Sequence, residues 1–278
     1  MATPLVSVAW LREHQNDPDL RIVDTRFVLG KPDAGRAAFD SGHIPTAVFA
    51  DLERDLCAVP QPDRQGGRHP LPTIPQLETS LSQIGISNDH HVIAYDDPSM
   101  GTGFYAAHLW WLLRYLGHDR VSVLDGGLPA WIAEGGTLDT EEHRTPGRFQ
   151  ARPQPAMMVD ANYVQSRTPS STLVDSRAPE RFRGEVEPLD WKAGHIPGAI
   201  NRNWADGLRD GHWKPAEEQQ ARFSEIQNAE EIIVYCGSGV SACGNLLALE
   251  LAGIETAKRY PGSWSDWISD NTRPIATL

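Results

Sequence analysis

The sequence is poor in cysteine and has no long apolar run. Its only cysteines among 278 residues are Cys57, Cys236 and Cys243. An odd and small number of cysteines excludes a disulfide framework and favours a reducing compartment. No stretch approaches the roughly 18 consecutive apolar residues of a membrane helix. Residues 1–10 also lack the basic start and apolar core of a signal peptide. We therefore expect a cytoplasmic protein that does not associate with membranes.

Positive charge is also scarce. The chain has 25 Lys and Arg against 37 Asp and Glu, a net charge of −12. Non-specific binding to nucleic acid needs a basic face, so nucleic acid is not an expected partner. An acidic chain that handles anions must gather positive charge at its site. Glycine and proline are plentiful, with 24 and 21 residues, which predicts many loops.

The chain repeats itself at the scale of a domain. Four landmarks recur in one order: 20–26 with 171–177, 41–49 with 193–201, 91–97 with 231–237, and 123–131 with 259–267. Solenoids and propellers repeat every 20 to 50 residues or so, which is far shorter. We predict a first domain over residues 1–137, a polar, proline-containing linker over 138–158, and a second domain over 159–278.

Each half alternates short β-branched runs with apolar helical segments. Residues 102–115 and 241–251 are expected to be helical, and each follows a buried strand directly. This order predicts an α/β fold in both domains, with a mainly parallel sheet flanked by helices. Ligands of such sheets bind beyond the carboxyl ends of the strands.

One loop stands out at such an end, directly after Tyr235. A strand delivers Cys236 to the sheet edge, and Gly237 and Gly239 allow a tight backbone. Small side chains leave the loop's amides open to a ligand; they belong to Ser238, Ser241 and Ala242. Amides that end at a helix N-terminus form an anion cradle, and the same field stabilises a thiolate. Cys236 is therefore a candidate nucleophile beside an anion site.

Two observations bear on this interpretation of Cys236. A cysteine at a strand end can also be buried packing, with glycines that merely close a turn. The first half has Asp96 at the position that matches Cys236. We therefore expect a single nucleophilic site in the chain.

Taken together, these landmarks resemble the rhodanese family, the thiosulfate and 3-mercaptopyruvate sulfurtransferases. The resemblance covers nearly the whole chain and is carried by residues 175–188, 194–204, 235–243 and 260–267. It implies tandem rhodanese-like domains, of which only the second is catalytic. It implies that Cys236 carries sulfur as a persulfide and that Arg181 binds an anion. The implied substrate-binding loop consists of Gly237, Ser238, Gly239, Val240, Ser241 and Ala242.

The resemblance leaves the sulfur donor open. Thiosulfate-preferring members usually carry Arg and Lys after the cysteine, where this chain has Gly237 and Ser238, as in the mercaptopyruvate branch. That branch also carries an arginine just after a Glu-Pro pair, where this chain has Leu189 and Asp190. Thiosulfate and 3-mercaptopyruvate both remain possible donors, with cyanide, a small thiol or a protein thiol as acceptor. No metal or organic cofactor is expected, and the oligomeric state is not predicted.

Several other residues have a structural and a functional interpretation. Arg177 and Arg183 are weaker anion-binding candidates, and we expect Arg177 to form a salt bridge. Cys243 is interpreted as a packed helix thiol, with a resolving cysteine as the alternative. His43 and His195 recur in both halves, one of them without a nucleophile, which favours a structural role. A further histidine, His69, lies in a long first-domain loop over 55–72 that is able to reach the second domain's cleft.

Three competing functions are weighed against sulfur transfer. A cysteine phosphatase shares the strand–cysteine–loop–helix layout but needs an arginine where this chain has Ala242. A thiol oxidoreductase would need Cys243 as a partner of Cys236, yet their spacing is not that of a redox pair. A non-catalytic binding module fits the first half, whereas the intact Cys236 loop argues against it for the second.

Overall fold

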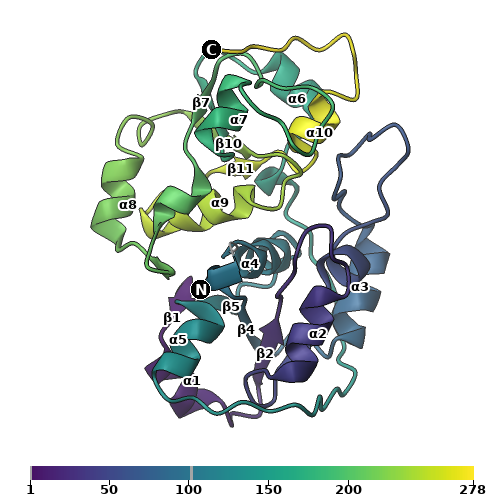
Figure 1. The fold of residues 1–278 in the computed structure, drawn as a ribbon, viewed down its shortest axis with the longest axis vertical. Helices are drawn as coiled ribbons and strands as arrows, with labels where there is room; N and C mark the ends of the chain where they lie inside the picture. The colour runs from purple at the N-terminus through teal and green to yellow at the C-terminus, as the bar shows by residue number, and fades with distance from the viewer. Residues whose placement is uncertain (1, 101–102) are drawn as a thin grey trace. The chain divides into compact units, whose positions relative to one another are not determined.

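Two parallel β-sheets organise the computed structural model, which describes residues 2–100 and 103–278 (Figure 1). The chain divides into two units. Unit 1 comprises Met1–Ala58, Pro72–Gln154 and Asp210–Trp213, and unit 2 comprises Val59–Leu71, Pro155–Arg209 and Lys214–Leu278. The segment Val59–Leu71 therefore packs with unit 2, although it lies within the range predicted for the first domain.

Unit 1 contains a five-stranded parallel sheet with the order β1-β5-β4-β2-β3. Its strands are β1 (Leu5–Val6), β2 (Leu20–Asp24), β3 (Val48–Phe49), β4 (His91–Tyr95) and β5 (Val121–Leu124). Its helices are α1 (Val8–His14), α2 (Ala34–Ser41), α3 (Ile74–Gln83), α4 (Tyr105–Tyr115) and α5 (Gly127–Ala133), with short turns η1 (Leu52–Leu56) and η2 (Pro98–Met100). β9 (His212–Trp213) also falls in this unit.

Unit 2 contains a four-stranded parallel sheet with the order β11-β10-β6-β7. Its strands are β6 (Ser171–Asp175), β7 (Ala199–Asn201), β10 (Glu231–Tyr235) and β11 (Lys258–Arg259), and β8 (Leu208–Arg209) lies outside this sheet. Its helices are α6 (Ala161–Ser166), α7 (Pro179–Arg183), α8 (Ala216–Arg222), α9 (Ala242–Leu251) and α10 (Ser263–Trp267), with short turns η3 (Pro155–Met157) and η4 (Trp204–Gly207). The expected α/β fold with parallel sheets is confirmed in both units.

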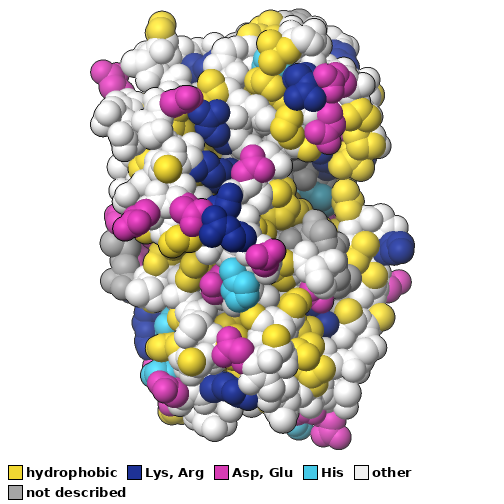
Figure 2. Space-filling model, turned by 60° about the vertical axis from the view of Figure 1, so that its left-hand side comes forward, with side chains coloured by type: hydrophobic (Ala, Val, Ile, Leu, Met, Phe, Trp, Pro, Cys, Tyr) yellow, Lys and Arg dark blue, Asp and Glu magenta, His cyan; other side chains and the backbone are white. Residues whose placement is uncertain are grey.

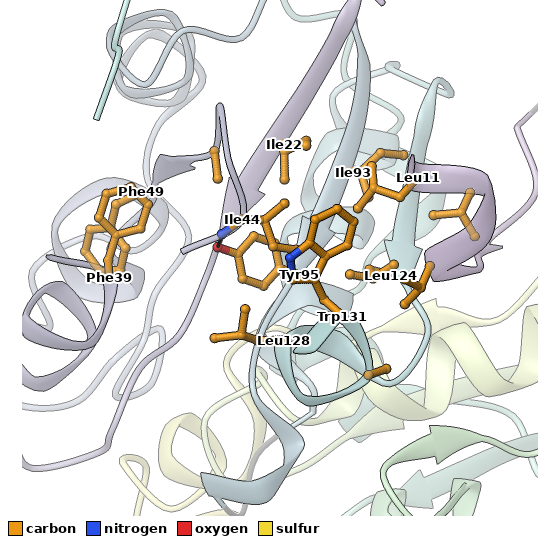
Figure 3. Close-up of a cluster of buried hydrophobic side chains, with 14 residues drawn as sticks. Leu11, Ile22, Phe39, Ile44, Phe49, Ile93, Tyr95, Leu124, Leu128 and Trp131 are labelled. Atoms are coloured by element: carbon orange, nitrogen blue, oxygen red, sulfur yellow. Dashed lines mark hydrogen bonds between the residues drawn. The ribbon is translucent and has the colours of Figure 1, made fainter. Parts of the chain in front are cut away.

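The central strands of both sheets are buried on both faces because helices cover them. β4 and β10 read as continuous apolar runs, and all but the first residue of each is buried. In unit 1, Tyr95 and Trp131 lie at the centre of a core cluster with Leu11, Ile93 and Leu124 (Figure 3). Packing against such helices fixes where each central strand ends, and so where the following loop begins.

The two halves reproduce each other's contacts in detail. Tyr95 Oη accepts a hydrogen bond from Ile44 N, and Tyr235 Oη accepts one from Ile196 N, both at 3.2 Å. The histidine preceding each isoleucine bonds a backbone carbonyl through Nδ1, His43 to Phe39 and His195 to Phe182. The same arrangement thus occurs twice, once with Phe39, His43 and Ile44 and once with Phe182, His195 and Ile196. The predicted structural role of both histidines is confirmed.

The helix predicted over 102–115 begins at Tyr105 in the structure, and Thr102 lies outside the described residues. The helix predicted over 241–251 begins one residue later, at Ala242. Across the described residues, no helix has the length and apolar character needed to span a membrane. On the face shown in Figure 2, Lys and Arg side chains are interspersed with Asp and Glu rather than gathered in a basic patch.

Candidate active site

Cys236 lies at the carboxyl end of β10, between the sheet and α10. Its backbone N–H donates to Ser263 Oγ at 3.1 Å, and its carbonyl accepts from Trp264 N at 3.0 Å. Only 1 % of the residue is exposed. A main chain held from both sides fixes the thiol at the sheet edge where parallel sheets bind ligands.

The loop after Cys236 depends on Gly239. Its φ of +86° favours glycine, and a Cβ there would lie 2.2 Å from the carbonyl oxygen of Pro261. The loop is tied a second time to α10, because Ser265 N donates to the carbonyl of Gly237 at 2.9 Å. The tight backbone expected for this loop therefore requires glycine at position 239.

The loop presents a run of amides. Within the described part of the chain, the backbone N–H groups of residues 237–242 donate no hydrogen bond. The run ends at the N-terminus of α9, a helix of ten residues, where the helix dipole adds positive potential. Ser241 occupies the N-cap position, but its side chain makes no capping hydrogen bond. The arrangement supports an anion cradle beside Cys236.

Two arginines, Arg68 and Arg181, end beside Gly237. An anion site in a chain of net negative charge needs such local positive charge. Arg181 pairs with Glu187, with Nη2 2.6 Å from Oε1. Asp190 lies 3.6 Å from the same nitrogen of Arg181 and 3.2 Å from Nε of Arg68. Burial raises the pKa of Asp190, although both arginines oppose that shift. The sequence interpretation included Arg181 and missed Arg68, which comes from the distant segment Val59–Leu71.

His69 belongs to the same segment and also reaches the loop. Its Nδ1 lies 2.8 Å from Ser238 Oγ, within hydrogen-bonding distance. Burial, followed by the positive charges of Arg68 and Arg259, lowers the pKa of His69 to about 4. The imidazole is therefore neutral near pH 7. The contact agrees with the expectation that the loop over 55–72 can reach the loop after Cys236.

The remaining arginine candidates are structural. Arg177 is buried, bonds both carboxylate oxygens of Asp175, and lies over the ring of Trp264 with its guanidinium carbon 4.8 Å from the centroid. The expected salt bridge of Arg177 is thus present. Arg183 pairs with Glu185 at the surface, where both side chains are exposed.

The second cysteine of this unit, Cys243, lies in the first turn of α9 and is fully buried. Burial raises the pKa of its thiol to about 12, against the opposing charge of Arg259. A thiol this hard to ionise is a poor nucleophile or resolving group. The interpretation of Cys243 as a packed helix thiol agrees with this environment.

Unit 1 has a carboxylate where unit 2 has the thiol. Asp96 follows β4 directly, and its Oδ2 accepts hydrogen bonds from Tyr105 N at 2.9 Å and Ala106 N at 3.1 Å, at the start of α4. Burial raises the pKa of Asp96 to about 6, in spite of these two hydrogen bonds.

The third cysteine, Cys57, lies at the end of η1 in the same unit and is also buried. No group of three His, Cys, Asp or Glu side chains able to hold a metal occurs among the described residues.

A duplicated α/β scaffold with a thiol at the start of a loop of unbonded amides is typical of cysteine-dependent transferases and hydrolases. Comparison with known proteins identifies the family. The rhodanese-like domain matches residues 7–134 and again 159–270. The chain belongs to the rhodanese family and is a sulfurtransferase.

Relatives match along nearly their full length. The chain is 46% identical over 283 residues to a Pseudomonas aeruginosa protein named "Probable 3-mercaptopyruvate sulfurtransferase", covering 98% of each. It is 33% identical over 276 residues to the thiosulfate sulfurtransferase of Mus musculus, covering 95% of this chain and 91% of that one. The crystal structure of SseA from Escherichia coli, a 3-mercaptopyruvate sulfotransferase, has a TM-score of 0.83 and 35% identity, covering 95% and 99%.

Proposed function

We propose that this sulfurtransferase carries the transferred sulfur as a persulfide on Cys236, and that it takes the sulfur from thiosulfate or 3-mercaptopyruvate. One observation carries the proposal. Cys236 directly precedes a run of backbone amides that ends at the N-terminus of α9. The N–H groups of this run donate no hydrogen bond among the described residues. That field stabilises the thiolate before the reaction and the persulfide anion after it.

The first half-reaction forms one S–S bond and breaks one bond of the donor. The Cys236 thiolate attacks the sulfane sulfur of thiosulfate, whose S–S bond breaks, and sulfite leaves with the electron pair. With 3-mercaptopyruvate the C–S bond breaks instead, and its electron pair forms the enolate of pyruvate. The proton of the donor's S–H group then goes to the enolate carbon. Either donor leaves an anionic persulfide on Cys236, an intermediate that divides the transfer into two steps.

Ser238 and its partner His69 lie where the donor would bind. The neutral imidazole can accept a hydrogen bond from the Ser238 hydroxyl, which leaves the Oγ lone pairs oriented toward the site. Alternatively the hydroxyl donates a hydrogen bond to the donor's oxygen while the imidazole donates to Oγ. In both arrangements the pair positions a polar hydroxyl without placing a charge in the pocket. Arg181 supplies a guanidinium for the donor's anionic group.

The second half-reaction returns the enzyme to its starting state. Cyanide or the thiolate of a small molecule or protein attacks the outer sulfur of the persulfide. The S–S bond breaks, and the Cys236 thiolate leaves with the electron pair. We further propose a cytoplasmic location, where the three buried thiols would remain reduced.

Mass spectrometry after incubation with each donor tests the persulfide. We expect an added mass of about 32 Da, the mass of one sulfur atom, on the peptide that contains Cys236. Cys236→Ser should form no adduct, and Cys243→Ser should form it as the wild type does. An adduct on Cys57 or Cys243 alone, or turnover by Cys236→Ser, would contradict the assignment.

A further inference from the structure

We infer that Arg68 is a donor-specificity residue, which with Arg181 binds the carboxylate of a 2-oxo acid donor such as 3-mercaptopyruvate. The inference rests on the proposed reaction at Cys236. It adds to that site a side chain from a segment far away in the sequence. Three observations carry it: where the two guanidinium groups end, how each is held, and how far a donor reaches.

Both guanidinium groups end at Gly237, the residue after the nucleophile. A Cβ at Gly237 would lie 2.9 Å from Arg68 Nη2, and 3.3 and 3.5 Å from Arg181 Nη2 and Nη1. Three nitrogens on two side chains thus approach one point beside Cys236. Any residue other than glycine would place its own side chain between the two arginines. Glycine leaves that position to a ligand.

The main chain of Arg68 is tied to the catalytic loop. Arg68 N donates to Ser265 Oγ at 2.9 Å, and Ser265 N in turn donates to the carbonyl of Gly237 at 2.9 Å. The preceding residue, Gly67, has a φ of +90°, and a Cβ there would lie 2.5 Å from the carbonyl oxygen of Gly262. The close approach of this segment to α10 therefore requires glycine, and it fixes where the Arg68 side chain starts.

Carboxylates hold both arginines from behind. Glu187 accepts hydrogen bonds from Nε and Nη2 of Arg181, and the buried carboxylate of Asp190 lies near both side chains. Asp190 Oδ1 lies 3.2 Å from Arg68 Nε, and Oδ2 lies 3.6 Å from Arg181 Nη2. The Asp190 side chain is 1% exposed, against 13% for Arg68 and 17% for Arg181. Asp190 lies on the Nε side of Arg68, and Nη2 of Arg68 is directed to the position of Gly237. The two carboxylates are thus the inner partners, and the Nη end of Arg68 and Nη1 of Arg181 are the edges that would meet a donor.

The span of the donor favours a carboxylate at this position. In 3-mercaptopyruvate, three bonds separate the sulfur from the carboxylate carbon, a span of about 4 Å. With its sulfur at Cys236, this donor can place its carboxylate by Gly237. Two guanidinium forks suit a planar carboxylate. In thiosulfate the sulfane sulfur is bonded directly to the sulfonate sulfur, so the oxygens stay nearer the loop amides.

Steady-state kinetics with both donors and one acceptor test the role of Arg68. For Arg68→Gln we expect KM for 3-mercaptopyruvate to rise roughly ten- to a hundredfold, the loss expected for a charged hydrogen bond. KM for thiosulfate should change less than about threefold, since an arginine that does not contact the anion acts only at a distance. Arg68→Lys keeps the charge without the fork and should recover only part of the loss. The matched control is Arg183→Gln, which removes a surface guanidinium on α7.

The thiosulfate reaction separates failure of this inference from failure of the proposed function. If Arg68→Gln raises both KM values equally, or leaves the value for 3-mercaptopyruvate unchanged, Arg68 is not a specificity residue, while the persulfide on Cys236 still stands. If no variant or wild-type protein forms that persulfide with either donor, the proposed function itself is wrong. A selective loss with 3-mercaptopyruvate, in protein that still uses thiosulfate, supports the assignment.

Discussion

The buried imidazole of His69 makes the stability of unit 2 depend on pH in a defined direction. Its pKa is lowered from 6.5 to about 4 by burial and by neighbouring arginines. Between these values the unfolded chain binds a proton that the folded chain does not, so the free energy of unfolding falls as pH decreases through this window. Each pKa unit corresponds to about 1.4 kcal/mol, which gives about 3 kcal/mol between pH 7 and pH 4. Well above pH 6.5 the ring is neutral in both states, and no stability is lost.

The assay is equilibrium urea denaturation of wild type and His69→Gln at several pH values from 4 to 8. Glutamine can still bond Ser238 but does not titrate, so the variant should lose this part of the pH dependence. The difference in unfolding free energy between the two proteins should therefore change by about 3 kcal/mol across the window. His143→Gln, which removes an exposed imidazole, is the matched control. Parallel pH curves for wild type and His69→Gln would refute the argument, because they would show that His69 is protonated equally in both states.

Three further outcomes follow from the structure. Cys243→Ala should retain sulfur transfer within about twofold in a turnover assay, because the thiol is buried, at a cost of about 1 kcal/mol of unfolding free energy for the lost packing. Asp96→Asn should raise the unfolding free energy at pH 8 by up to ~3 kcal/mol, since the folded carboxyl titrates about two units above its unfolded value. That gain should shrink as pH falls from 6 to 4, which denaturation at both pH values measures. Gly239→Ala should lower stability by at least about 2 kcal/mol and abolish persulfide formation seen by mass spectrometry, because its Cβ meets the Pro261 carbonyl.

The parts of the site that could be predicted from sequence are those that lie on one continuous segment. The strand, Cys236, the glycine loop and the helix follow each other directly, so local patterns contain their arrangement. Arg68 and His69 lie in a loop of the other half, and His69 meets Ser238 across 169 residues. Their approach depends on Gly67 fitting against Gly262, which no periodic pattern records. The one available signal was a pair of basic residues in a glycine-rich loop of an acidic chain.

The duplication helps to separate structural residues from candidate functional ones. An Asp-x-Arg sequence ends the equivalent strand in both halves, and each pair forms a buried salt bridge, Asp24 with Arg26 and Asp175 with Arg177. A feature that is present in a unit without a thiol serves the scaffold. Arg181 has no such counterpart in the repeated landmarks, which agrees with a role specific to unit 2.

Asp96 shows what this scaffold does with an anion at the end of its central strand. The Asp96 carboxylate bonds the first two amides of α4, so in unit 1 the protein supplies its own negative group at the helix N-terminus. At the equivalent position unit 2 has the short thiol side chain of Cys236, followed by glycines. The amides of residues 237–242 donate no hydrogen bond among the described residues and are available to a ligand. Burial raises the pKa of Asp96 to about 6 even with two amide hydrogen bonds, so two amides do not offset the cost of a buried charge. We expect the longer run over residues 237–242, with arginines beside it, to hold the proposed anionic persulfide at the buried position of Cys236.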